Sequence, residues 1–491
     1  MAYGPGVDTG GAPPSEELRP ELADVGRLLR RGMRAVVGAA RADERVTLTR
    51  ILAAHLGEDA ASLEVVQESW PSYEHVNVQG GLDAWLADPA RTSELVGIVG
   101  YQHRPFGLGE LLAASEASAQ DPFGPRPGSP SRVNQPAGPD GEVRPCVRCG
   151  LYLVTEGDAR LAVFFRGPEP EMGMPVTVLH VAGTDAERAR RAVAEIRAES
   201  LAHNVFRGQV LSFGADVFGH AGMFVPGMAQ LSFLRRPSLA ADQLVLDPST
   251  LAEVERHVVE VARHRDRLLA AGQHLKRGLL LFGPPGVGKT HTVRFLMSRL
   301  VGTTVVQLTG GALQFIAEAC SIARQLQPAM VVVEDVDLIA EERGMHPGQH
   351  PLLFQLLNEM DGLAEDADVV FVLTTNRPDL LEPALAARPG RVDQAVALQL
   401  PDAAARRALF ELYRGDLDVD TSRLDDVLAR TEGVTASFLK ELLRRAALVA
   451  ATRTPGDGAI AVSAGDLEAA LDELLDTRNA MTRALLGSAA D

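Results

Sequence analysis

Residues 282–290 combine glycine, lysine and threonine at a spacing that suits the binding of a polyphosphate. They follow an apolar run, 279–281, that predicts a buried strand, and we expect a helix over 290–301. Glycines let backbone N–H groups curl around an anion, and the positive end of the helix would point at the same anion. The pattern G-x-x-x-x-G-K-[ST] in this context predicts a nucleotide-binding loop, in which Lys289 reaches the β- and γ-phosphates and Thr290 offers its hydroxyl to Mg²⁺. The residues predicted to hold the nucleotide are Gly283, Pro284, Pro285, Gly286, Val287, Gly288, Lys289, Thr290 and His291.

Lysine is rare in this chain, which makes the lysine of the loop informative. Three of the 48 basic residues are lysine, namely Lys276, Lys289 and Lys440, and one of them falls where the loop needs it. The alternative is a glycine-rich turn between a strand and a helix with no ligand. We favour the nucleotide loop because strand, turn and helix occur in the order that the motif requires.

Hydrolysis of a nucleotide also needs carboxylates and a polar group near the γ-phosphate. The apolar run 331–333 predicts a strand that ends in Glu334 and Asp335. One carboxylate should hold the Mg²⁺ shell, and the other should polarise the attacking water. Asp337, two residues on, is expected to be structural. Asn376 closes a later predicted strand, where it could touch the γ-phosphate or the water.

Two arginines, Arg388 and Arg391, flank a Pro-Gly turn after a short predicted helix. We expect them to face outward, as arginine fingers do. Such a finger stabilises transition-state charge, here on the nucleotide of a neighbouring subunit. Surface arginines without a role are the alternative, and the surrounding motifs count against it.

Together these segments resemble the AAA ATPases. The resemblance rests on GPPGVGKT at 283–290, LLNEMDGL at 356–363, TTNRPDLLEPAL at 374–385 and RPGRVD at 388–393, and it covers about 242–480. It implies a P-loop α/β subdomain with a small helical lid, ATP and Mg²⁺ as cofactors, and a homo-oligomeric ring, a hexamer or heptamer.

The resemblance also implies roles for single residues. Lys289 and Thr290 correspond to Walker A, and Glu334 and Asp335 to Walker B, with Thr290 and Glu334 as the residues that hold the metal. Asn376 corresponds to sensor 1, and Arg388 and Arg391 to the arginine fingers. The segment 433–437 corresponds to the part of the lid on the adenosine side.

Two departures from the family pattern affect the expected activity. Walker B ends Glu-Asp instead of Asp-Glu, so the metal-shell role should fall to Glu334 and the water-activating role to Asp335, whose shorter side chain predicts slow hydrolysis. The segment between Leu308 and Pro328 lacks the usual aromatic–hydrophobic–glycine pore loop, for which 315–317 is a poor substitute. Threading of a peptide through a narrow pore is therefore not expected.

The two departures are typical of one AAA subfamily, and a missing zinc motif counts against another. Together with the sequence of 276–282, they resemble the AAA subfamily of the mitochondrial translocase of the Rieske iron–sulfur protein, although we find no membrane anchor like that subfamily's. No His-Glu-x-x-His occurs, so the zinc site of the AAA metalloproteases is not predicted.

The elements that must position these residues predict an α/β fold. From 242 onward apolar strands alternate with helices, which predicts a parallel sheet covered on both faces. The strands expected besides that of the loop are 243–246, 304–308, 330–334, 369–374 and 396–400, with a helix at 248–271. Upstream, the pattern predicts strands at 151–155, 160–166, 175–181 and 209–213 and a helix at 185–201.

These patterns and the Pro/Gly content divide the chain. We predict a disordered tail at 1–20, a mainly helical N-terminal domain at 21–115, a Pro/Gly-rich linker at 116–145, a small α+β domain at 146–240, the large ATPase subdomain at 241–400, a helical lid at 401–480 and a tail at 481–491.

Bulk composition excludes some classes of protein. A net charge of −17 counts against broad nucleic-acid binding. The sequence has no run of 18 apolar residues free of charge, so we predict no membrane-spanning helix. The polar N-terminus predicts no secretory signal, and three cysteines, an odd count, suit a reducing cytoplasm. Cys146 and Cys149 have metal-ligand spacing, but a second pair is missing and Cys320 is remote. A half-site shared between subunits or a redox pair stays open, and two ordinary cysteines are favoured.

The sequence therefore predicts an ATP hydrolase that assembles into a ring and remodels or moves a protein client that the sequence does not identify. The N-terminal domains would choose the substrate. The alternative is an ATP-gated assembly or scaffold protein with slow hydrolysis. A nucleic-acid-linked AAA protein is a weaker option because the chain is acidic.

Overall fold

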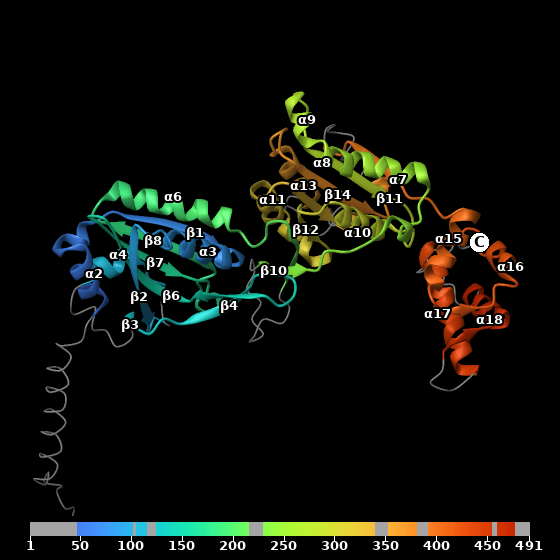
Figure 1. Cartoon of the computed structure of the whole chain (residues 1–491), viewed down its shortest axis with the longest axis horizontal. Coiled ribbons are helices and arrows are strands. Elements are labelled where there is room, and N and C mark those ends of the chain that lie inside the picture. The colour runs from blue at the N-terminus through green and yellow to red at the C-terminus, as the bar shows by residue number, and fades with distance from the viewer. Residues whose placement is uncertain are drawn as a thin grey trace, which may run out of the picture.

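The computed structural model describes residues 47–101, 105–114, 124–215, 229–338, 352–380, 391–453 and 459–476. Three parts follow one another along the molecule: an N-terminal sheet with its helices, a second sheet with its helices, and a helical C-terminal part (Figure 1). Among the described residues, none of the helices combines the length and the apolar character that crossing a bilayer would require.

The N-terminal part is built on one antiparallel sheet of six strands in the order β1-β8-β7-β6-β2-β3. Its residues alternate between two cores: Ala162 and Phe164 of β7 pack against α2 and α4, while Val163 and Phe165 pack against α3 and α6. The strands are β1 (Val65–Pro71), β2 (Arg91–Val99), β3 (Arg126–Gly128), β6 (Cys149–Glu156), β7 (Ala159–Arg166) and β8 (Val176–Gly183). The helices are α2 (Leu48–Leu56), α3 (His75–Leu86), α4 (Leu108–Ala113) and α6 (Ala186–Ala202).

Two predictions for this part were wrong. The region 21–115 does not form a separate helical domain where it is described, because β1 and β2 pair with β8 and β6 in one sheet. The region 116–145 is not simply a linker, because it contains β3 and most of a hairpin formed by β4 (Arg132–Pro136) and β5 (Val143–Val147). These strands are only partly buried, so their sequences lack strong alternation, and partners far along the chain supply their hydrogen bonds. The predicted strands at 151–155, 160–166 and 175–181 and the helix at 185–201 are confirmed.

The second sheet has seven strands in the order β10-β9-β12-β13-β14-β11-β15, all parallel except β10. Strand β13 is buried on both faces: Val331 and Val333 face α11 and α13, and Met330 and Val332 face α7 and α10. The predicted α/β architecture is confirmed. The strands are β9 (Val210–Ala215), β10 (Ala229–Leu234), β11 (Arg277–Phe282), β12 (Thr304–Leu308), β13 (Ala329–Val333), β14 (Val369–Thr375) and β15 (Gln394–Ala397). The helices are α7 (Pro248–Glu255), η5 (Arg256–Glu260), α8 (Val261–Arg263), α9 (Arg265–Ala270), α10 (Lys289–Arg299), η6 (Gly310–Phe315), α11 (Ile316–Gln325) and α13 (Leu352–Asp361).

The limits of this sheet differ from the predicted ones. The strand expected at 209–213 is present as β9, but it joins the second sheet beside β12 and not the upstream α+β domain. Its apolar residues serve both faces, with Leu211 and Phe213 in one core and Val210 in the other. No strand forms at 243–246, where a short 3₁₀ turn, η4 (Ala241–Gln243), leads to an irregular segment.

The segment that follows β10 is hydrogen-bonded to the C-terminus of α10, the helix after the nucleotide loop. The guanidinium of Arg236 donates to the carbonyl oxygens of Met297 (2.8 Å), Leu300 (3.2 Å), Thr303 (2.6 Å) and Gly208 (3.0 Å). Carbonyls at a helix C-terminus have no partner within the helix, and a cation there is favourable. Arg236 thus ties the added strands to the end of α10.

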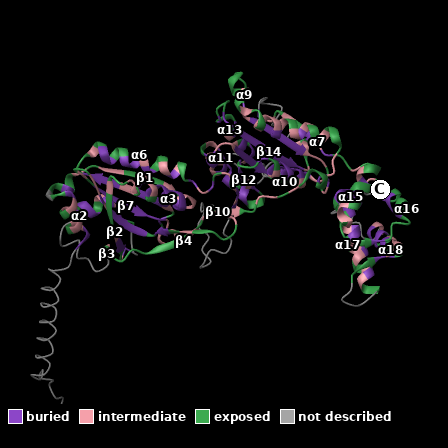
Figure 2. Ribbon diagram, viewed as in Figure 1, coloured by how far each residue is buried: buried purple, intermediate pink, exposed green. Residues whose placement is uncertain are grey.

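The first two parts share an apolar contact. One core cluster joins Val76 and Phe206, from the N-terminal side, to residues of β9, β12 and α11. The ring of Tyr73 meets that of Phe213 edge-on at 5.6 Å. Buried residues accordingly line both sheets (Figure 2).

The C-terminal part has its own core, centred on Phe410 and Phe438. The predicted helical lid is confirmed, with one addition, a short parallel pair of β16 (Asp418–Val419) and β17 (Ala461–Val462). Its helices are α15 (Ala403–Arg414), α16 (Leu424–Ala429), α17 (Ala436–Arg453) and α18 (Ala464–Leu475).

Candidate active site

The nucleotide loop joins the carboxyl end of β11, which lies between β14 and the edge strand β15, to the N-terminus of α10. Gly283, Gly286 and Gly288 have φ values of 148°, 82° and 110°, which other residues rarely adopt. A Cβ at Gly283 would also lie 2.3 Å from the carbonyl oxygen of Leu398. Glycine is therefore required at these turns, and the loop has the backbone that the sequence predicts.

Lys289 lies at the centre of this loop and is 7% exposed. Its Nζ donates to the carbonyl oxygens of Gly283 (2.8 Å) and Pro284 (2.9 Å) and to Oδ1 of Asn376 (2.7 Å). Burial lowers the pKa of Lys289, and the nearby carboxylates of Asp335 and Asp337 oppose that shift. Three acceptors, two in the loop and one at the end of β14, thus hold the ammonium at the predicted phosphate-binding loop.

Thr290 and Glu334 come together beside the loop. The Thr290 hydroxyl donates to Oε2 of Glu334 (3.0 Å), and the other carboxylate oxygen accepts from Nε2 of Gln307 (3.0 Å). A hydroxyl next to a carboxylate is an oxygen donor set that suits Mg²⁺. The residues predicted to face the metal therefore fit it. Gln307 was not predicted, and its only signal is its place in β12, the strand beside Walker B.

Asp335 and Asn376 complete a polar chain across the strand ends. The Nδ2 group of Asn376 donates to Oδ1 of Asp335 at 3.4 Å, while its Oδ1 accepts from Lys289. Asp335 has a φ of 52°, the only positive value at a residue other than glycine in the described chain, and its N–H donates to the Thr374 hydroxyl (3.0 Å). Such backbone strain is typical of functional sites. One amide thus contacts both the predicted phosphate-binding cation and the predicted water-activating acid.

Asp337 has the structural role expected for it. Its carboxylate is buried and accepts from the Thr375 hydroxyl (2.8 Å) and from the backbone N–H of Asn376 (3.3 Å). These contacts fix the end of β14, and with it the side chain of Asn376.

Arg391 does not face outward, which corrects that prediction. Its side chain is 1% exposed and forks onto the carboxylate of Asp361, at the end of α13, with Nε 2.9 Å from Oδ1. The backbone of Arg391 also passes so close to Gly278 that a Cβ there would lie 2.1 Å from the arginine carbonyl oxygen. The turn that precedes Arg391, including Arg388, lies outside the described residues.

We expect Arg391→Ala to act mainly on stability. The substitution removes both hydrogen bonds from Arg391 to Asp361. Because the carboxylate of Asp361 is 47% exposed, water can replace part of what is lost, and the free energy of unfolding should fall by about 1–3 kcal/mol. Denaturant unfolding measures this change. The control is Arg407→Ala, whose exposed ion pair with Asp425 should contribute less than about 1 kcal/mol. Equal stability of the two variants would contradict the structural role of Arg391.

A cavity of about 600 Å³ lies beside the loop, between the irregular segment after η4 and the lid. Val287, Leu246 and Leu398 contribute apolar walls to it. The lid reaches the loop directly, because the backbone N–H of Ser437 donates to the carbonyl oxygen of Gly286 (3.2 Å). The segment 433–437 thus contacts the nucleotide loop, and its role on the adenosine side stays a prediction. Leu246 and Leu398 were not predicted, since an apolar residue in a strand or loop carries no specific signal.

His291 contacts another part of the chain. Its Nε2 carries the proton, since it lies 2.9 Å from the carbonyl oxygen of Gln243, which can only accept. The ring therefore fixes the segment that leads into the cavity.

The segment 315–317 is not an exposed loop. Phe315 is 5% exposed and stacks on Phe213 at 5.3 Å, and Ile316 is fully buried. These side chains belong to the core and present no aromatic group to a pore.

The three cysteines are buried and reduced. Cys146 and Cys149 belong to different core clusters, and burial raises the pKa of Cys146 to about 12. Within the described ranges, no three histidine, cysteine or acidic side chains gather as metal ligands would.

Comparison with known proteins agrees with this geometry. Residues 279–400 match the family model "ATPase family associated with various cellular activities (AAA)". The chain is 36% identical over 230 residues to ATP-dependent zinc metalloprotease FtsH 2 of Sphaerobacter thermophilus, covering 44% of this chain and 34% of that protein. It is 29% identical over 297 residues to the FtsH of Mycobacterium tuberculosis, covering 55% and 38%. The chain thus spans little more than a third of the length of these two relatives.

Proposed function

We propose that this chain, which carries an AAA ATPase domain homologous to that of FtsH, uses ATP hydrolysis in a ring-shaped oligomer to remodel or move proteins or complexes. The observation that carries the proposal is the contact of Asn376 with both Lys289 and Asp335, beside the pair of Thr290 and Glu334. Phosphoryl transfer needs a cation, a water-activating acid and a polar sensor, and these residues supply all three.

The side chains divide the work of hydrolysis. Lys289 binds phosphate oxygens, and Asn376 holds the γ-phosphate or the attacking water near Asp335, which polarises that water. Thr290 and Glu334 would hold Mg²⁺, which neutralises phosphate charge when bound. Since the Asp335 side chain is shorter by one methylene than the usual glutamate, turnover is slow.

The N-terminal sheet domain would choose the substrate or partner. It has two cores of its own and lies outside the region that matches the AAA family. Proteolysis is not part of the proposal, because these 491 residues contain no His-Glu-x-x-His. The site of action would be the cytoplasm. The departures at Walker B and at 315–317 support kinship with the Rieske-translocase subfamily.

The second candidate is an ATP-gated assembly or scaffold protein with residual hydrolysis. The inverted Walker B and the burial of Phe315 favour it, since neither suits rapid threading of a polypeptide. Steady-state turnover measured beside nucleotide-dependent sedimentation separates the two functions. Assembly that follows nucleotide binding, with turnover that no client stimulates, would support the scaffold.

Lys289→Ala should abolish ATP binding, because it removes the cation predicted to contact two phosphates. Binding of labelled ATP to the variant, measured by filter retention or calorimetry, tests this. The control is Lys440→Ala, which changes a lysine in the lid helix α17 and should leave ATP binding intact. Undiminished binding by the Lys289 variant would refute the nucleotide site.

A further inference from the structure

A second cavity, of about 400 Å³, lies between the N-terminal sheet domain and helix α11 of the ATPase domain. On the N-terminal side its walls include Trp70, Tyr73 and Glu74, and on the other side Ser321 and Gln325, one turn apart on α11. The site is remote from the nucleotide loop in sequence, and the hydrolysis scheme uses none of these residues.

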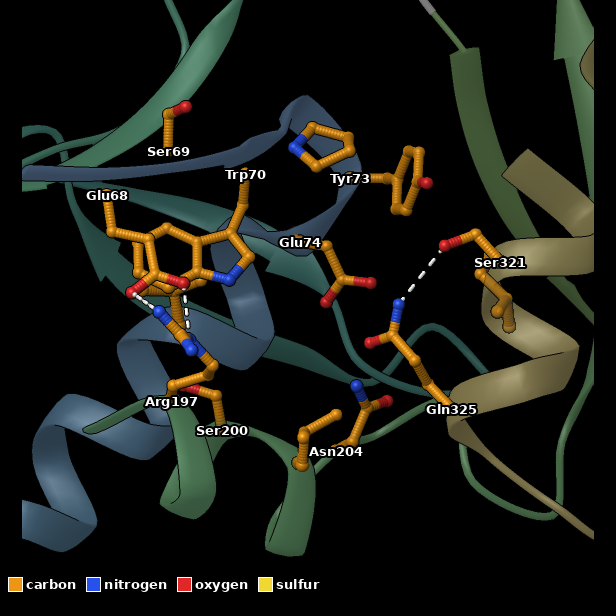
Figure 3. A pocket seen from close by; sticks show the side chains of 14 residues that line it. Glu68, Ser69, Trp70, Tyr73, Glu74, Arg197, Ser200, Asn204, Ser321 and Gln325 are labelled. Atoms are coloured by element: carbon orange, nitrogen blue, oxygen red, sulfur yellow. Dashed lines mark hydrogen bonds and ion pairs between the residues drawn. The ribbon is translucent and has the colours of Figure 1, made fainter. Parts of the chain in front are cut away.

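The carboxylate of Glu74 is the distinctive group in this cavity. Figure 3 shows it directed into the space between Trp70 on one side and Tyr73 and Gln325 on the other. One oxygen accepts from Nδ2 of Asn77 at 2.8 Å. In the described chain no basic group pairs with Glu74. Burial raises the pKa of this carboxyl to about 7, and the hydrogen bond from Asn77 opposes the shift.

The other charged groups at the cavity do not neutralise Glu74. Arg197 is held by Glu68 through two bonds of 2.5 and 2.7 Å (Figure 3). Burial, and then the carboxylates of Glu74 and Glu318, raise the pKa of the Tyr73 phenol, so Tyr73 stays protonated. Glu318 thus adds negative potential from the side of α11. A carboxylate without a cation is costly in such a place, and a cation bound there would remove that cost.

The aromatic groups favour the same kind of ligand. The faces of tryptophan and tyrosine attract cations, most strongly where water is displaced. Trp70 and Tyr73 are only partly buried and flank the carboxylate. We propose that this cavity binds a small organic cation, an alkylguanidinium or alkylammonium group, between Glu74 and the two aromatic rings. The proposal does not depend on the function of the ATPase domain.

The test compares n-butylguanidinium with n-butylurea, which has nearly the same shape and no charge, by ligand-observed NMR on the full chain at pH 8. We expect saturable binding of the guanidinium and at least about tenfold weaker binding of the urea, since a factor of ten corresponds to about 1.4 kcal/mol. Equal binding of the two compounds, or no binding of the guanidinium, would overturn the proposal.

Glu74→Gln removes the charge and keeps an oxygen that can accept from Asn77. It should weaken guanidinium binding at least about tenfold, whereas Glu64→Gln, an exposed acid paired with Arg190 outside the cavity, should not. Trp70→Leu, which removes one ring, should weaken binding independently of Glu74. Binding to the unaltered chain should fall about tenfold from pH 8 to pH 6, because protonation of Glu74 removes its charge. Binding that neither variant changes would refute the site.

Discussion

Asp335→Asn should leave ATP binding intact and lower turnover by about 10²–10⁴-fold, the range for loss of a general acid–base group. Lys289, Thr290 and Glu334, which bind the nucleotide and its metal in our proposal, are unchanged in this variant. Asparagine can still accept from Asn376, and it tolerates the left-handed backbone of this position better than most residues. The loss therefore reports on the missing carboxylate and not on a distorted loop. Single-turnover hydrolysis and equilibrium binding measure the two quantities.

The matched control is Glu334→Gln, which disturbs the neighbouring carboxylate. Its oxygens contact Thr290 and Gln307, so we expect weaker binding of Mg²⁺, and hence a higher Mg²⁺ concentration for half-maximal turnover, as well as slower turnover. If Glu334→Gln alone preserved binding and blocked hydrolysis while Asp335→Asn hydrolysed normally, the two roles would be reversed.

The ATPase domain could be predicted because its signals are local. The glycines of the loop, the acids after β13 and the amide after β14 each stand at the end of an apolar strand, and parallel strands bring their carboxyl ends to one edge. Glu334, Asn376 and Lys289 meet there as that rule requires. The order of the motifs was therefore enough to predict the α/β fold and that Glu334, Asn376 and Lys289 lie at the same edge of the sheet.

Side-chain orientation and long-range pairing could not be predicted in the same way. Arg391 fits its motif, yet its direction depends on Asp361, thirty residues away and at the end of another helix. Strand β9 is apolar and predictable as a strand, but its partner β12 lies about 95 residues further on, so no local pattern assigns it to a sheet. The partly buried carboxylate of Glu74 has no sequence signal, because its cavity forms only where two domains meet.

Arg388→Ala should lower turnover by about 10³–10⁵-fold, the effect of arginine fingers in other NTPases. The burial of Arg391 leaves Arg388 as the predicted finger. A finger acts on charge that develops on a neighbour's nucleotide, so the variant should still bind ATP. Its stability should match that of the unaltered chain, in contrast to Arg391→Ala.

Mixing experiments test whether active sites are shared between subunits. Arg388→Ala subunits keep Lys289 and bind ATP, while Lys289→Ala subunits keep Arg388, so a mixed ring contains some complete sites. Turnover should then recover in part, and for the unaltered chain it should rise more steeply than linearly with concentration through the assembly range. Mixing Arg388→Ala with a doubly substituted subunit, Lys289→Ala with Arg388→Ala, supplies no finger and should recover nothing. Full specific activity of a monomer at every concentration would contradict both the shared site and the ring.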